Sequence, residues 1–395
     1  MSGPLEKMLA KNKGVIEAVL ESVQRGAAVF ASEGGTLFPF CELAIPVLRL
    51  ALDKLASKEV IFVKEQFLGV MNQIEVLSHQ LEDTDCEIKM GKVDLQYFPV
   101  EENIRNQFRK CMDILKAEPK FREVKTKQFL DHFPKSDGDK NLHALYDDLM
   151  GNNSFGETSL DVVKKYVKMN RRLLEDFCVK MKELFCLGLI ALLGHCVLTQ
   201  SPDEELEDTI HKWSVKMVEV ELKMKDCIEA CVSAFPEQAE VDARRLLQEK
   251  KERDLKDTAR EVLEFLIRKY DWVHWSVRAV NDSGSCLRNH RAGDHFQHMT
   301  SQSCFELQKV NDTNLVVSYS TCPQPVELEK IQQLMEVLEK KGKAQAVAEA
   351  LKMELAGFVV HVVSRHKESE AAWSFPEDCH YWERHKNVAV CVHSE

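Results

Sequence analysis

Four residues in the histidine-rich C-terminal third of the sequence are of the types that bind metal ions. The stretch GDHFQHMTSQSC contains Asp294, His295, His298 and Cys304, and proteins bind zinc through carboxylate, imidazole and thiolate groups. The spacing of these residues matches no known zinc motif, and the stretch has the composition of a loop. We therefore name them as candidate ligands, but expect surface histidines, no bound metal and no cofactor.

A second cluster, in EDCHYWERH, contains Cys379, His380 and His385 and also lacks the spacing of a ligand set. The sequence contains none of the patterns GxSxG, GxxxxGKS/T or GxGxxG, which would position a nucleophilic serine or bind phosphate. We therefore predict that the protein is not an enzyme.

The net charge argues against some classes of binding partner, and the cysteine content indicates the cellular compartment. The 53 basic and 64 acidic side chains give a net charge of −11, which argues against nucleic-acid binding and against simple electrostatic attraction to anionic membranes. The thirteen cysteines form no CxxC pair, and the first residues, MSGPLEKMLAKNKG, contain no apolar signal region. We therefore expect reduced thiols and a cytoplasmic location.

A run without charged side chains, residues 184–198, precedes an acidic stretch. Fifteen helical residues would extend roughly 22 Å, which is shorter than the roughly 30 Å hydrocarbon core of a bilayer. We expect a buried core helix, with conditional membrane contact as the alternative. The residues that carry either interpretation are Leu184, Phe185, Leu187, Gly188, Leu189, Ile190, Leu192, Leu193 and Gly194.

Two glycines interrupt this run, and each costs about 1 kcal/mol of helix stability relative to alanine. Gly188 and Gly194 could allow close packing against a neighbouring helix, with 36–52 as the candidate neighbour. Alternatively, the lowered helix stability could allow the bend to reorganise. We favour close packing.

The elements that must position these residues are mostly helices. Apolar spacing predicts helices over 15–29, 36–52, 61–81, 101–117, 121–133 and 238–269. Thr158 and Asp161 have capping-box spacing and start a helix over 160–198, while Ser201 and Pro202 are expected to start the next one. The short turn between these two helices predicts an antiparallel pair. In the second helix, a coiled-coil-like heptad pattern joins Leu206, Ile210, Trp213, Met217, Val220, Met224, Cys227 and Cys231.

The pattern changes after residue 268. Alternating apolar residues predict a strand at DWVHWSVRAVN, a hairpin over 304–320 and strands at GFVVHVVSR and NVAVCVHS, with a helix over 326–355. The predicted fold is therefore mainly α: an elongated antiparallel helical bundle over 1–268, with the apolar segment 184–198 at a helical bend, followed by a small C-terminal α+β domain over 269–395.

Two stretches of the bundle resemble the rapunzel family of ray-finned fishes. They are MGNNSFGETSLDVVKKYVKMNRRLLEDFCVKMKELFCLGLIALLGHCVLTQ and the following DTIHKWSVKMVEV. The resemblance implies a non-enzymatic protein connected with fin and skeletal development, for which no catalytic or binding residues are defined. The family is similar to a wider cephalotoxin-like group, and its bundle resembles the α-helical pore-forming toxins.

Three functional hypotheses follow from the residues and the resemblance. The first is a developmental or regulatory protein that acts through contacts with unidentified protein partners, with self-association left open. The alternative is a membrane-active helical bundle that inserts the bend at 184–198. The second alternative is a metal-binding or enzymatic C-terminal domain.

Overall fold

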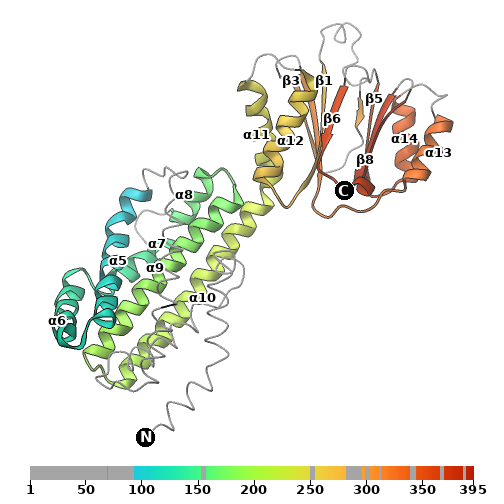
Figure 1. Ribbon diagram of the computed structural model, residues 1–395. Coiled ribbons are helices and arrows are strands. Elements are labelled where there is room, and N and C mark those ends of the chain that lie inside the picture. The colour runs from blue at the N-terminus through green and yellow to red at the C-terminus, as the bar shows by residue number, and fades with distance from the viewer. Residues whose placement is uncertain are drawn as a thin grey trace. The chain divides into compact units, whose positions relative to one another are not determined.

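The computed structural model describes residues 69, 93–152, 157–249, 254–281, 296–298, 303–310, 313–338, 344–364, 369–385 and 388–395. The helices predicted over 15–29, 36–52 and 61–81 lie outside these residues, apart from Gly69, which is helical. The chain divides into two compact units, Met1–Val232 and Ser233–Glu395, which are coloured from blue to red along the sequence in Figure 1.

Six helices make up the described part of the first unit. They are α5 (Val93–Lys116), α6 (Pro119–Lys135), α7 (Lys140–Met150), α8 (Ser159–Tyr166), α9 (Arg171–Leu198) and α10 (Asp203–Ser233). Helix α9 packs against α5, α6, α7 and α8, and α10 lies along it (Figure 1). Apart from Val179, the buried apolar side chains of the described helices in this unit form one continuous core, in which α9 is the central helix.

The helix predicted over 160–198 is in fact two helices, α8 and α9. The start is as predicted, because the side chain of Thr158 accepts a hydrogen bond from the backbone amide of Asp161. The break follows from two successive left-handed residues, Lys168 (φ 50°) and Met169 (φ 58°), which a right-handed helix cannot contain. Asn170 then caps α9 by accepting a hydrogen bond from the amide of Leu173, 3.3 Å away.

Helices α9 and α10 form the predicted antiparallel pair. Phe185 contacts Trp213 near the connecting turn, and Lys182 contacts Glu221 further from it, so residue numbers fall along one helix as they rise along the other. Helix α10 begins at Asp203, one residue later than predicted. Seven of the eight heptad side chains are buried, and the eighth, Ile210, is partly buried against the same core. The prediction that the heptad residues face the core is therefore confirmed.

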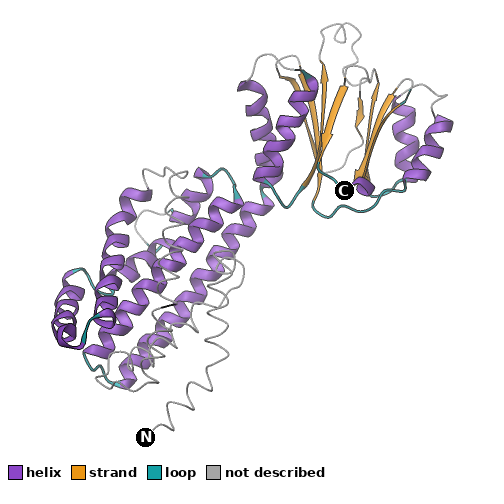
Figure 2. Cartoon of the chain, in the orientation of Figure 1, coloured by secondary structure: helices purple, strands orange, loops and turns teal. Residues whose placement is uncertain are grey.

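The second unit contains four α-helices and eight strands in its described part. They are α11 (Phe235–Glu249), α12 (Leu255–Lys269), β1 (His274–Asn281), β2 (Phe296–His298), β3 (Cys304–Val310), β4 (Thr313–Ser320), α13 (Leu328–Leu338), α14 (Ala344–Glu354), β5 (Phe358–Ser364), β6 (Ser369–Trp373), β7 (His380–Arg384) and β8 (Val388–Ser394). The strands form two antiparallel sheets, ordered β3-β4-β1-β6 and β2-β5-β8-β7. Figure 2 shows helices flanking both sheets. The mainly α fold with a C-terminal α+β part is confirmed.

The two sheets lie between two pairs of helices, and the inner strands β1 and β8 are buried on both faces. In β1, Trp275 and Val277 pack with the apolar side chains of α11 and α12. The alternate residues Ser276 and Arg278 contact β7 and β8 of the other sheet. In β8, Val390 packs toward α13 and α14. This order of helices, sheet, sheet and helices leaves an inner layer between the sheets.

Three features of this unit differ from the predictions. The helix predicted over 238–269 is divided into α11 and α12, and the helix predicted over 326–355 is divided into α13 and α14. Strands β2, β6 and β7 were not predicted. Helix α12 belongs to the second compact unit, since it buries one face, including Val262 and Leu266, in the core shared with β1.

Candidate functional site

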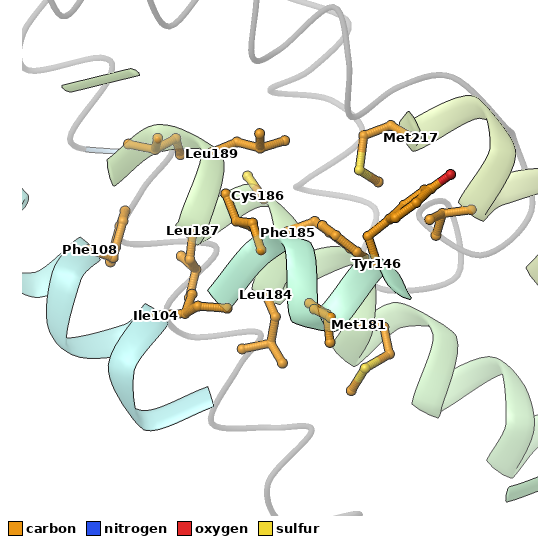
Figure 3. Close-up of a cluster of buried hydrophobic side chains, with 14 of the residues drawn as sticks. Ile104, Phe108, Tyr146, Met181, Leu184, Phe185, Cys186, Leu187, Leu189 and Met217 are labelled. Atoms are coloured by element: carbon orange, nitrogen blue, oxygen red, sulfur yellow. The ribbon is translucent and has the colours of Figure 1, made fainter. Parts of the chain in front are cut away.

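The apolar segment of α9 lies in the centre of the bundle core. All nine candidate residues, from Leu184 to Gly194, are buried, and the most accessible of the apolar side chains, Leu192, is 8% exposed. Figure 3 shows Leu184, Phe185, Leu187 and Leu189 among side chains of neighbouring helices. In this arrangement the segment is covered on every side, as a helix that is apolar all round requires.

The two glycines of this segment allow close helix packing. A Cβ atom on Gly188 would lie 2.5 Å from Cδ2 of Leu142 in α7, and one on Gly194 would lie 2.7 Å from Sγ of Cys111 in α5. Neither distance is compatible with a side chain at the glycine. Close packing therefore accounts for both glycines, with α7 and α5 as the neighbours; the segment 36–52 lies outside the described residues.

Paired charges border the N-terminal end of the apolar segment. Arg105 of α5 donates to both carboxylate oxygens of Glu183, at 3.1 and 3.3 Å, and also to Glu101. Lys180 contacts Glu101, and the buried Lys182 of α9 contacts Glu221 of α10. Burial opposes the charge on Arg105, but the charges of Glu183 and Glu101 prevail and raise its pKa. The buried ions are therefore compensated, as stability requires.

His195 lies at the C-terminal end of the segment and is the only titratable imidazole in it. Its ring stacks on Phe133 of α6 at a centroid distance of 4.5 Å and meets Phe129 edge-on. Burial lowers the pKa of His195 below its ordinary value. The imidazole therefore acts here as a neutral aromatic group that closes the core.

Helix α9 is longer than the uncharged run suggests. It contains 28 residues, and among the described helices it alone is long and apolar enough to cross a membrane. In the bundle, 78% of its most apolar window is buried. The length estimate from residues 184–198 was therefore too short, because the helix begins at Arg171, although burial remains the state observed.

The four candidate metal ligands do not form a described site. Asp294 and His295 lie outside the described residues. His298 in β2 pairs with His361 of β5, whereas Cys304 in β3 pairs with Ser318 of β4, so the two occupy different sheets. Within the described residues, no group of three or more histidine, cysteine or acidic side chains could hold a metal ion.

The second candidate cluster is also dispersed. Cys379 lies in the short 3-10 helix Glu377–Cys379, where its thiol contacts the carboxylate of Asp378. His385 contacts the hydroxyl of Tyr381. His380, by contrast, is buried in the layer between the sheets. Only His380 therefore belongs to a wider polar arrangement.

That arrangement, here called the inter-sheet cluster, consists of Ser276, Arg278, Ser318, His380, Cys391 and His393. Arg278 is fully buried at its centre and donates from Nη1 to Ser276 Oγ and Cys391 Sγ, both at 3.0 Å, and from Nη2 to Ser318 Oγ at 2.9 Å. His380 Nε2 lies 2.9 Å from Ser276 Oγ. The sequence signal was the polar face of β1, where Ser276 and Arg278 alternate with apolar residues.

Both histidines of the inter-sheet cluster are neutral. Burial and the charge of Arg278 lower the pKa of His380 and of His393 to about 3. His393 Nδ1 donates to the carbonyl of Ser394 at 2.7 Å, so its Nε2 accepts from the hydroxyl of Ser318 at 2.6 Å. Phe375 packs against both rings. The cluster therefore holds one permanent positive charge.

The chain is similar to two groups of characterised proteins. It matches the cephalotoxin-like middle helical domain over residues 54–253. Protein rapunzel from Danio rerio is 31% identical over 220 residues, which cover 93% of that protein and 55% of this chain. SE-cephalotoxin from Acanthosepion esculentum is 17% identical over 295 residues, and this chain spans 27% of its length. No solved structure matches the chain.

The domain match covers α5 to α10 and the whole of α11, so the bundle that contains the apolar segment lies within it. The similarity to rapunzel extends over nearly all of that protein. The family expected from the sequence is confirmed: the chain is a rapunzel-like member of the cephalotoxin-like family.

Proposed function

We propose that this protein is a non-enzymatic developmental or regulatory protein, connected with fin and skeletal development, that acts through contacts with other proteins. The observation that supports this proposal is the similarity to rapunzel over 93% of that protein's length. A cytoplasmic location goes with the proposal. It is supported by seven described cysteines that are free thiols, as is usual in a reducing compartment: Cys111, Cys178, Cys196, Cys227, Cys322, Cys379 and Cys391.

The proposal can be tested by asking whether this chain replaces rapunzel in Danio rerio. Danio rerio embryos that lack rapunzel would receive messenger RNA for this chain or for its Leu192→Glu variant, which places a carboxylate in the bundle core. We expect the wild-type chain to restore fin growth and the variant to fail. Failure of a wild-type chain that is expressed and folded would contradict the developmental role.

The second candidate function is membrane activity of the bundle. It is favoured by α9, which is long and apolar enough to cross a membrane, and by the match to a cephalotoxin-like domain. In this proposal the bundle opens and α9 enters the bilayer from its C-terminal bend. The energetic obstacle is large, because the segment must first lose its contacts with α5, α7 and α10.

Paired core variants separate membrane insertion from simple loss of stability. Leu192→Glu changes the apolar segment, and Leu145→Glu places the same charge in the same core on α7, where Leu145 is fully buried. Both should lower the melting temperature, because each buries an unpaired carboxylate. Insertion predicts that wild type and Leu145→Glu bind liposomes while Leu192→Glu does not. A wild-type protein that never binds liposomes would eliminate this candidate.

A further inference from the structure

The inter-sheet cluster contains a buried charge without an acidic side-chain partner. Arg278 has no exposed surface, and in the part of the chain that the structure describes no carboxylate pairs with it. A guanidinium that is removed from water without a counter-charge costs several kcal/mol. The two neighbouring histidines are neutral and cannot balance it. Among the described residues, a negative charge that compensates Arg278 can come only from the side chains that it contacts.

Among the side chains that Arg278 contacts, Cys391 is the one that can become an anion. Its sulfur accepts from Arg278 Nη1 at 3.0 Å. It also lies 3.5 Å from His380 Nε2 and 3.6 Å from Ser276 Oγ. Each of these three neighbours can donate a hydrogen bond to it, and charge-assisted bonds of this kind are the strong ones.

The protonation of His380 is consistent with an anionic sulfur. Its Nδ1 is buried and has no hydrogen-bond partner among the described residues. A proton on Nδ1 would be an unsatisfied buried donor, which costs more than an unused acceptor site. The proton therefore belongs on Nε2, which points to Ser276 and Cys391. Ser276 is then free to donate its own hydroxyl proton toward the sulfur.

We propose that Cys391 is a thiolate paired with Arg278, and that this pair is a site of oxidation by a peroxide. The sulfur attacks one peroxide oxygen, the O–O bond breaks, and a sulfenic acid and hydroxide form. The sulfur is oxidised by two electrons and the peroxide is reduced. The sulfenic proton then passes to the hydroxide, which gives water and a sulfenate. The negative charge beside Arg278 is preserved throughout.

We place the route to the sulfur at the edge where β6 and β7 lie, because an exposed side chain covers the cluster there. Cys391 itself has no exposed surface, but His380 beside it is covered by Trp373, whose side chain is 41% exposed. The two rings are stacked at a centroid distance of 4.7 Å. β6 and β7 are end strands of their sheets. In this proposal, a small oxidant such as hydrogen peroxide reaches the cluster when Trp373 moves locally.

Cys379 supplies a matched control in the same unit. It is also buried, with 5% exposure, but its thiol contacts the carboxylate of Asp378 instead of a guanidinium. Burial, the hydrogen bond to Asp378 and its charge raise the pKa of Cys379. Exposure alone predicts that Cys379 reacts first, whereas the charge of its surroundings predicts that Cys391 does.

The first experiment measures the thiolate directly and does not depend on access. Ultraviolet thiolate absorbance at neutral pH would be recorded for the full chain, Cys391→Ser and Cys379→Ser, each checked for folding by circular dichroism. We expect Cys391→Ser alone to lower the absorbance, by one thiolate per chain. An unchanged absorbance in a folded Cys391→Ser variant would overturn the ion pair.

The second experiment uses the wild-type chain, so it does not depend on whether a variant folds. The native protein would be treated with hydrogen peroxide for increasing times, then quenched and unfolded in the presence of dimedone, and the labelled cysteines mapped by mass spectrometry. We expect Cys391 to be labelled about tenfold faster than Cys379, because the thiolate is the reactive form. Equal or faster labelling of Cys379 would overturn the oxidation site.

Discussion

At the scale of single residues, the sharpest constraint is the missing side chain at Gly188. A Cβ atom there would lie 2.9 Å from Cγ of Leu142 as well as 2.5 Å from Cδ2, so the whole isobutyl group must move. Overpacking of this kind costs about 1–3 kcal/mol, whereas alanine gains about 1 kcal/mol of helix propensity over glycine. We predict that Gly188→Ala lowers the free energy of unfolding, measured by urea denaturation.

The companion measurement is a double-mutant cycle with Leu142→Ala. Removing the Leu142 side chain leaves space for the new methyl group, so adding Gly188→Ala to that background should be neutral or stabilising. Additive losses in the cycle would mean that the two residues are independent, which would contradict close packing as the reason for the glycine.

The candidate zinc ligands give a second prediction at this scale. Because His298 and Cys304 occupy different sheets and their spacing matches no zinc motif, we predict no stoichiometric zinc in protein purified without chelator. Elemental analysis is the measurement. Zinc bound at one ion per chain in wild type, and absent from His295→Ala/His298→Ala, would instead establish a metal site.

At the scale of helices, the ion pairs beside the apolar segment should contribute more to the free energy of unfolding than ion pairs on the surface. Glu183→Gln leaves Arg105 in a partly buried position with half of its negative surroundings, and we predict a loss of about 3 kcal/mol in unfolding free energy. Glu118→Gln is the matched control, since Glu118 and Lys120 form a pair with about two thirds of each side chain exposed. That change should cost less than about 1 kcal/mol.

Thermal or urea unfolding of the two variants decides this prediction. A loss for Glu183→Gln no larger than that for Glu118→Gln would mean that Glu101, which also contacts Arg105, is sufficient to compensate the guanidinium. The Arg105–Glu183 pair would then contribute no more to stability than an exposed ion pair on the surface.

A helix or strand could be predicted from the sequence where residues close together in the chain determine it. The heptad from Leu206 to Cys231 could be predicted because each buried side chain lies three or four residues from the next, so one helix face carries the whole signal. The break before Arg171 could not be predicted, because lysine and methionine are not residue types that favour the left-handed conformation that Lys168 and Met169 adopt. The result was one helix predicted where the chain forms two.

The inter-sheet cluster could not be predicted from the sequence, because its residues lie far apart in the chain. Arg278 and Cys391 are 113 positions apart and meet only because two sheets pack face to face. A polar residue that alternates with apolar ones along a strand is ordinarily expected to face solvent. The pattern of β1 was therefore read correctly as a strand, while the burial of its polar face depended on a second sheet that the sequence did not predict.

At the scale of the whole molecule, the two units should respond differently to acid. The pKa values of His380 and His393 are lowered to about 3 in the folded second unit, against 6.5 for an ordinary histidine. A lowered pKa means that the folded state binds fewer protons than the unfolded state. The stability that the neutral His380 and His393 contribute to the second unit is therefore fully present above pH 6.5 and is lost as the pH falls toward 3. In the bundle, His143 and His195 shift in the same direction, but both are partly exposed, so their effect is smaller.

We therefore predict that the second unit unfolds first as the pH is lowered. The tryptophans separate the units, because Trp213 lies in the bundle and the other four, Trp272, Trp275, Trp373 and Trp382, lie in the second unit. Tryptophan fluorescence of Trp213→Phe, which reports the second unit alone, should change at a higher pH than the main loss of helical circular dichroism, because α5 to α10 contain most of the described helical residues. His393→Gln should reduce the pH dependence of the fluorescence transition, since one of the two titrating groups is removed. A single transition, in which both signals change together and are unaffected by His393→Gln, would contradict the prediction.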